Sequence, residues 1–223
     1  MRKLVIMLSI PVIVAGSCRQ ANSQTSNTDN IMENDTQWYE QDKLDIEKFL
    51  ENAEERVHVT MDPVSTFYWF MKEFPDGRKV EISGREDYGF QRVETLPLPH
   101  FYEIYTSFYK NGNMERKGMK LIRGIYIGVF EYYDENGNKV YETNLDEVYS
   151  DFDYNKFLKV LHNERIINLE TGENRDKITW IGYDGANKIW TVVVYDETVG
   201  GAISYQIDHK TSPETVRKTI NKY

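Results

Sequence analysis

Cysteine and histidine are both scarce in this sequence. Cys18 is the only cysteine among 223 residues, so no disulfide can form within the chain and the fold must be stabilised by buried apolar side chains. No two histidines stand two or four residues apart, the spacings that bring imidazoles together on a strand or a helix. We therefore expect no metal and no cofactor; the histidines are His58, His100, His162 and His209.

Basic residues are outnumbered by acidic ones. The chain has 27 lysines and arginines against 36 aspartates and glutamates, which gives a formal net charge of −9. Because proteins bind nucleic acids chiefly through basic side chains that meet phosphates, this composition argues against a nucleic-acid partner. The same negative surface is repelled by anionic lipid head groups, so membrane attachment requires a covalent anchor.

The apolar run at the start of the chain is too short to span a membrane. Leu4–Val14 has about eleven residues, where a transmembrane helix needs roughly 20. Two positive residues precede this run, and three small residues follow it, directly before Cys18. That order is typical of an export signal with a cleavage site, so we predict that residues 1–17 are a signal peptide that is removed.

A cysteine at the cleavage site makes this segment resemble a bacterial lipoprotein signal peptide, although Ala15 stands where that family usually has leucine. The resemblance implies that Cys18 carries palmitate and other acyl chains as the first residue of the mature protein. It also implies a lipid-anchored protein of the cell envelope, at the outer membrane on its periplasmic side or at the cell surface. Loss of Arg2 and Lys3 with the signal would take the net charge from −9 to −11. Ordinary secretion with an incidental cysteine is the alternative.

After the anchor, the sequence predicts a tether and then a helix. Residues 18–36 are mostly Ser, Thr, Asn and Gln, which indicates a disordered tether that reaches at most about 60 Å. Trp38–Val57 follows with apolar residues at helical spacing, and Asp35 or Asp42 is a candidate cap. We expect one amphipathic helix there, with an apolar face made of Ile46, Phe49, Leu50, Ala53 and Val57.

Three turn motifs recur in residues 37–150, each after an aromatic residue and before a short charged and apolar run. They are centred on Gly77, Gly112 and Gly137, and Asn-Gly occurs in the last two. Asn-Gly between alternating runs predicts a β-hairpin with a type I′ turn, which needs positive φ at both central residues. One hairpin cannot bury its own face, so we expect an antiparallel sheet of stacked hairpins.

Residues 108–114 (FYKNGNM) and 124–138 (GIYIGVFEYYDENGN) resemble the MORN-like repeat of antitoxin-repeat proteins. The likeness covers about residues 101–145, and Phe130 stands where that family more often has tryptophan. It implies a hairpin-repeat sheet, and it raises an immunity or antitoxin-like role by analogy with the family.

Residues 151–223 have a different pattern. Tyr154–Leu161 shows helical spacing, and three strand-like runs follow at 177–183, 188–196 and 202–208. This order, ending in YQIDHKT, resembles a PepSY-like domain, although Ser212-Pro213 replaces the glycine turn of that family. The resemblance implies inhibition or chaperoning of peptidases. The predicted fold class is α+β: an amphipathic N-terminal helix, a hairpin-repeat sheet, then a helix with a three-stranded antiparallel meander.

Catalytic motifs are missing. There is no G-x-S-x-G sequence, and the acidic pairs are no more than a chain with 36 acidic residues produces by chance. The segment Asp134–Leu145 begins like a calcium loop but has lysine where that loop needs glycine and leucine where it needs glutamate. We therefore predict a protein that is not an enzyme and holds no metal.

What remains is a stripe of aromatic residues, from which we select Tyr109, Tyr132 and Tyr133 as candidate binding residues. Consecutive strand side chains point to opposite faces, so we expect Tyr133 in the core and Tyr132 outside. The sequence thus predicts a non-enzymatic envelope lipoprotein that binds a protein partner, as an immunity or inhibitory module. Two alternatives stay open. The protein is an envelope hydrolase or carbohydrate-active enzyme that uses dispersed carboxylates, or the aromatic stripe has only a structural role and covers the two faces of the sheet.

Overall fold

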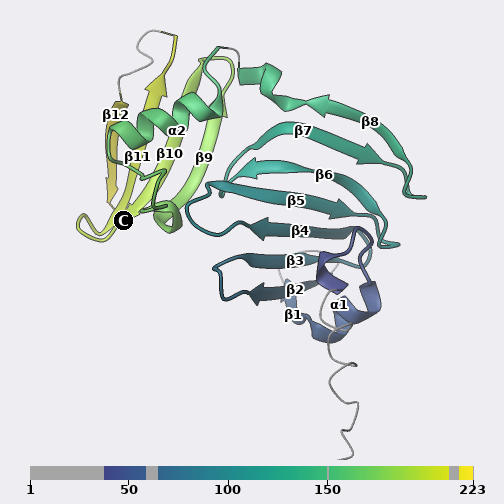
Figure 1. Cartoon of the computed structure of the whole chain (residues 1–223). Helices are drawn as coiled ribbons and strands as arrows, with labels where there is room; N and C mark the ends of the chain where they lie inside the picture. Colours follow the sequence, from purple (N-terminus) through teal and green to yellow (C-terminus); the bar gives the residue numbers. More distant parts are fainter. Residues whose placement is uncertain (1–37, 59–64, 150, 211–215, 223) are drawn as a thin grey trace, which may run out of the picture. The chain divides into compact units, whose positions relative to one another are not determined.

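The computed structural model describes residues 38–58, 65–149, 151–210 and 216–222, and all structural statements refer to these residues. The predicted signal peptide, Cys18 and the predicted tether lie outside them. The described chain is α+β, with few helices and two antiparallel sheets of eight and four strands (Figure 1). This confirms the predicted class. None of the described helices is long and apolar enough to cross a membrane.

The eight-stranded sheet, here called the large sheet, is a meander in which every strand pairs antiparallel with its neighbours in sequence (Figure 1). From β3 onward, each strand follows from the preceding one by a short reversal of the chain. The strands are β1 (Glu54–His58), β2 (Ser65–Glu73), β3 (Lys79–Arg85), β4 (Gly89–Thr95), β5 (Tyr102–Phe108), β6 (Met114–Leu121), β7 (Tyr126–Tyr133) and β8 (Lys139–Asn144).

Three of these reversals, β2–β3, β5–β6 and β7–β8, have one geometry. The glycine N–H donates to the carbonyl three residues earlier at 2.9 Å in each: Gly77 to Phe74, Gly112 to Tyr109 and Gly137 to Asp134. The glycines have φ of +87°, +81° and +87°. The asparagines before Gly112 and Gly137 are not among the residues with positive φ, so the type I′ prediction is wrong. A three-residue loop closed by a left-handed glycine satisfies the same sequence.

A short N-terminal layer covers one face of β2–β5. It consists of η1 (Trp38–Glu40) and α1 (Ile46–Asn52), and Phe49 of α1 is fully buried against Val80, Ile82 and Phe90. Arg92 fastens this layer to the sheet, since its Nη1 donates to the carbonyls of Tyr39 at 3.0 Å and Gln41 at 2.7 Å.

The predicted helix over 38–57 is wrong in extent. The helix covers Ile46–Asn52 only, and its cap is Asp45, whose carboxylate accepts from the Lys48 N–H at 3.2 Å. Ala53 is extended, and Glu54–His58 pairs with β2 instead. The backbone hydrogen bonds of the sheet outweigh the helical spacing of the apolar residues in this segment.

The four-stranded sheet, here called the small sheet, follows η2 (Leu145–Tyr149), α2 (Tyr154–Asn163) and η3 (Arg175–Lys177). Asp153 caps α2, and the predicted apolar face of this helix is buried. The strands are β9 (Ile178–Asp184), β10 (Ile189–Asp196), β11 (Gly201–Asp208) and β12 (Val216–Lys222). The predicted meander of three strands lacks β12, because this exposed edge strand shows no alternation of apolar and polar residues.

The two sheets share one apolar cluster. Phe101 and Leu121 of the large sheet region belong to it together with Phe157 of α2 and Trp190 of β10. Trp190 is fully buried, stacks on Phe157 at 4.7 Å between ring centroids, and donates from Nε1 to the Phe152 carbonyl at 3.1 Å. The boundary at residue 150/151 stays a prediction.

Candidate binding surface

The strand register defines a face of the large sheet that points away from α1. Directly paired residues point to the same side of a sheet, and successive residues alternate. Ile82 and Phe90 pack toward α1, so their neighbours Ser83 and Gln91, which pair with each other, point to the opposite side. We call this side the open face.

One row of directly paired residues crosses all eight strands on the open face. Each neighbouring pair in the row is a register pair of adjacent strands. Aromatic side chains stand toward both ends of this row and polar ones in its middle. The row is Glu54, Trp69, Ser83, Gln91, Ser107, Arg116, Tyr132 and Tyr141.

The polar middle of the open face is held by hydrogen bonds between strands. Gln91 donates from Nε2 to Ser83 Oγ at 3.1 Å, and Ser107 donates from Oγ to Glu115 Oε2 at 2.8 Å. Two rows nearer the start of β5, Glu103 is buried and its Oε2 lies 3.0 Å from the Lys120 ammonium. Polar side chains paired in this way hold fixed positions, which pre-organises the surface.

Arg116 is surrounded by aromatic rings. Its Nη2 donates to the Tyr105 hydroxyl at 3.2 Å, and its guanidinium carbon lies 5.2 and 5.3 Å from the ring centroids of Tyr105 and Tyr126. Phe130 completes the cluster, 5.0 Å from the Tyr126 ring. The Phe130 ring lies over Gly118, where a Cβ atom would come within 2.4 Å of it. A glycine at this position therefore lets the aromatic ring lie flat on the sheet.

The ionisation of this cluster is fixed near neutral pH. Burial, and then the neighbouring Tyr105, raise the pKa of Tyr126 to about 12. Burial alone would lower the pKa of Arg116, but the hydrogen bond to Tyr105 and the nearby phenols outweigh it and leave this pKa raised. At neutral pH the cluster thus presents the Arg116 cation beside the neutral Tyr126 phenol, which suits recognition better than proton transfer.

A groove of about 510 Å³ lies on strands β2–β6, and Tyr105 and Arg116 of this cluster are part of its lining. Small residues form part of its lining, where Gly84 brings the β3 backbone close to β4 and Gly89 brings the β4 backbone close to the Phe108 carbonyl of β5. Tyr88 stands at its rim with 88% of its surface exposed. The groove therefore joins an aromatic rim to polar side chains, and its volume falls in the range of ligand pockets.

The three predicted tyrosines lie on or next to this surface, with different roles. Tyr109 lines the groove, and its hydroxyl donates to the Tyr133 carbonyl at 2.8 Å. Tyr132 stacks on Tyr141 at 4.4 Å between centroids, almost parallel. Tyr133 donates to Glu131 Oε2 at 2.9 Å. The expectation that Tyr133 is a core residue is wrong, because Tyr132 and Tyr133 are both half-buried near the end of an edge hairpin.

Sequence reasoning missed Arg116 and Tyr126. Arg116 stands in no motif, whereas Tyr126 lies in the repeat-like segment 124–138 but was not selected, and the two residues belong to different strands. Only the strand register could have placed them on this surface. The turn at Gly112 aligns Ser107 with Arg116, and the next hairpin aligns Arg116 with Tyr132. That alignment follows from the sequence only after the loop length is known.

Among the residues that the structure describes, no three His, Cys, Asp or Glu side chains gather as metal ligands would. The Asp134 segment that imitates a calcium loop is a turn, where Asp134 Oδ1 accepts from the N–H groups of Asn136 at 3.0 Å and Asn138 at 2.9 Å. These bonds lower the pKa of Asp134.

Comparisons with known protein families, curated proteins and solved structures give no match for this chain.

Proposed function

We propose that this chain is an envelope lipoprotein that binds a protein partner through the open face of the large sheet. The observation that carries the proposal is the row across the eight strands, with Trp69 near one end, Arg116 in its second half and the Tyr132–Tyr141 stack at the other end. Tryptophan, tyrosine and arginine are the residue types that most often dominate the energy of protein interfaces.

The exposure of these side chains fits that role. Tyr141 is 55% exposed although it stacks on Tyr132, and Arg56 covers Trp69 at 4.3 Å from the ring centroid. Rings held by such contacts lose little conformational entropy when a partner covers them. The interstrand hydrogen bonds of the open face also keep its shape fixed before binding.

The groove argues for binding rather than hydrolysis. A glycosidase needs two carboxylates about 5–9.5 Å apart, one of them protonated. Glu115 is the only carboxylate that lines this groove in the described chain, and it accepts a hydrogen bond from Ser107. A second groove, on the small sheet, is lined by two carboxylates, Glu164 and Asp196. Asp196 accepts from Thr198 there, and this bond lowers the Asp196 pKa, the opposite of what a general acid needs.

The finer assignments come from the sequence. The lipidated Cys18 and an envelope location rest on the order of residues 1–18. An immunity or inhibitory role rests on the likeness of residues 101–145 to MORN-like antitoxin repeats, which is supported by the common geometry of the Gly77, Gly112 and Gly137 turns. The order of α2 and the strands after it supports the PepSY-like assignment of the last segment.

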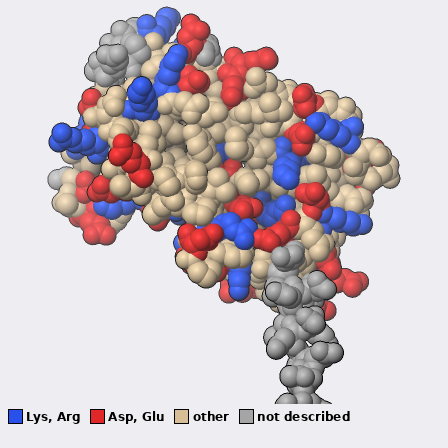
Figure 2. All heavy atoms as spheres, in the orientation of Figure 1, with Lys and Arg blue, Asp and Glu red and all other residues tan. Residues whose placement is uncertain are grey.

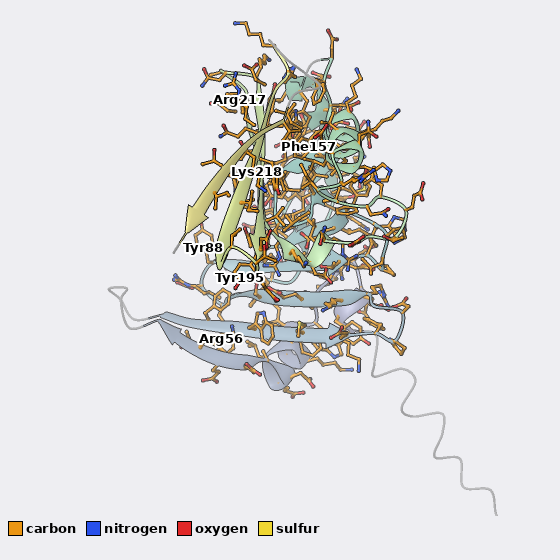
Figure 3. All side chains as sticks on the ribbon, turned by 90° about the vertical axis from the view of Figure 1, so that its left-hand side faces the viewer. Arg56, Tyr88, Phe157, Tyr195, Arg217 and Lys218 are labelled. Carbon is orange, nitrogen blue, oxygen red and sulfur yellow. The ribbon has the colours of Figure 1, made fainter. Side chains whose placement is uncertain are left out.

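The test is crosslinking and pull-down from the native envelope with the parent protein and with a Tyr132→Ala, Tyr141→Ala variant. We expect the variant to lose most of the captured partner. Tyr195→Ala is the comparison variant on the other sheet, because Tyr195 is 45% exposed and lies on β10 of the small sheet (Figure 3), and we expect it to keep the partner captured by the open face. Thermal denaturation of all three proteins checks that the fold is intact.

The competing outcomes are distinct. Capture that survives the double tyrosine variant but is lost with Tyr195→Ala would move the interface to the small sheet. A measured turnover that disappears with Glu115→Gln, while capture is unchanged in all variants, would replace the binding proposal by the enzymatic alternative.

A further inference from the structure

Many basic residues of the large sheet make ion pairs, whereas several around the small sheet do not. Figure 2 shows acidic and basic groups next to each other over the large sheet. Six basic residues of its strands make ion pairs within 4.0 Å: Arg56, Lys79, Arg85, Lys117, Lys120 and Lys139. On the small sheet and the loops beside it, Arg165, Lys177, Arg217 and Lys218 make no such pair with another described residue. Within the described chain, these four side chains therefore carry positive charge with no acidic group within 4.0 Å, although the chain has a net charge of −9.

Two of these cations belong to β12, which is an edge strand. β12 pairs with β11 along seven residues without a bulge, and no described strand lies on its other side. Its sequence, VRKTINK, has three basic residues and no acidic one. The residues from Arg217 to Ile220 are exposed, and Figure 3 shows Arg217 and Lys218 on this strand. A regular edge of this kind can pair with another extended chain.

A groove of about 490 Å³ adjoins β12. Tyr205 and Val216 contribute apolar surface to its lining, and Arg165, Lys177 and Lys218 contribute the positive charge. Lys218 Nζ lies 5.8 Å from the Tyr205 ring centroid. Glu164 and Asp196 also line the groove, but Asp196 already accepts from the N–H and hydroxyl of Thr198 at 2.8 and 2.6 Å. Side chains of an added chain thus find both apolar contacts and cations here.

We propose that β12 accepts an acidic, extended peptide of a partner protein as a fifth strand of the small sheet. Arg217 aligns with Gln206 and Lys218 with Tyr205, so these two cations point to opposite faces. The added strand therefore needs acidic residues at adjacent positions, one for each face. A second copy of this chain is a poor occupant, because pairing two β12 strands would bring like charges together. The proposal is independent of the open face.

The experiment is a fluorescence anisotropy titration of the full-length protein in detergent. The probe is a labelled peptide of about ten residues, rich in valine and threonine, with two pairs of adjacent glutamates. We expect saturable binding that weakens with salt, together with slower hydrogen exchange of β12 amides. The same peptide with glutamine in place of glutamate should bind about tenfold more weakly.

A third peptide separates strand addition from simple charge attraction. It keeps all glutamates, but its central backbone amides are N-methylated and cannot donate to β12. We expect it not to bind, and binding equal to that of the parent peptide would overturn the proposal. The three peptides are compared on the unmodified protein, so this result does not depend on the folding of any variant.

Variants locate the site. Lys218→Glu should weaken binding about tenfold, whereas Lys72→Glu, which reverses an exposed strand lysine of the large sheet, should leave it unchanged. Equal losses in the two variants would overturn the proposal, since they would indicate general charge attraction. Self-association through β12, detected by sedimentation of the parent protein and abolished by Lys218→Glu, would also overturn it.

Discussion

Alanine at Gly112 and at Gly137 should affect stability very differently, although both glycines close the same kind of turn. At Gly137 the φ is +87° and a Cβ atom would meet nothing within 4 Å, so the cost is the left-handed backbone alone, about 1 kcal/mol. At Gly112 the φ is +81°, and the Cβ atom would also lie 2.3 Å from the carbonyl oxygen of Leu44.

That contact makes Gly112 part of the N-terminal layer. Leu44 is 2% exposed, and its N–H donates to the Gly112 carbonyl at 2.9 Å. Moving Leu44 away would break this bond and disturb the core under α1, which adds roughly 2–4 kcal/mol to the backbone cost. We therefore expect Gly112→Ala to cost about 3–5 kcal/mol in total, several times the cost of Gly137→Ala.

Thermal denaturation measures the difference. For a chain of this size, about 1 kcal/mol shifts Tm by roughly 2–4 °C, so Gly137→Ala should lower Tm by about that amount and Gly112→Ala by about 10 °C. Gly77→Ala is a second control, because it has the same φ as Gly137 and equally open surroundings. Equal Tm changes in all three variants would refute the assigned contact between the turn and Leu44.

Three further predictions concern single side chains. Arg92→Met should lower the free energy of unfolding in urea by about 2–4 kcal/mol, because two carbonyls lose their donor; an unchanged midpoint would contradict this. Tyr126 has a folded pKa of about 12 against a reference of 10.0, so the stability that it contributes is full below pH 10 and is lost as pH rises toward 12. Between pH 10 and pH 12, the free energy of unfolding of Tyr126→Phe should therefore fall less than that of the parent protein. Parallel curves of unfolding free energy against pH would contradict the burial of the phenol. Cys18→Ser should abolish labelling by a palmitate analogue and leave the protein unprocessed or released, whereas equal labelling of both forms would contradict lipidation.

Local features of the sequence predicted local structure well. The helix predicted from the spacing of Tyr154–Leu161 is confirmed as α2, in which Phe157, Leu158 and Leu161 are buried. The turn glycines have positive φ because only glycine adopts that backbone without strain. The turn type was wrong, since Asn-Gly fits both a two-residue loop and a three-residue loop that ends in glycine.

Features that depend on distant residues were predicted poorly. Glu54–His58 has the spacing of a helix, yet it pairs with β2, which supplies backbone partners that no local pattern reveals. β12 was not predicted, because an exposed edge strand does not need the alternation of apolar and polar residues that identifies a strand in the sequence. Arg116 and Tyr126 meet because of the register between β6 and β7. That register depends on the lengths of the loops that connect successive strands, so no single motif reveals it.

The division follows the range of the interactions. Composition, charge, the predicted export segment, the turn glycines and the α+β class depend on properties of neighbouring residues, and the sequence contains them directly. The open-face row, the single apolar cluster shared by both sheets and the cations left around β12 depend on which strands lie side by side. Strand order is settled by the total burial and hydrogen bonding of the whole chain, so only the folded structure brings those residues together.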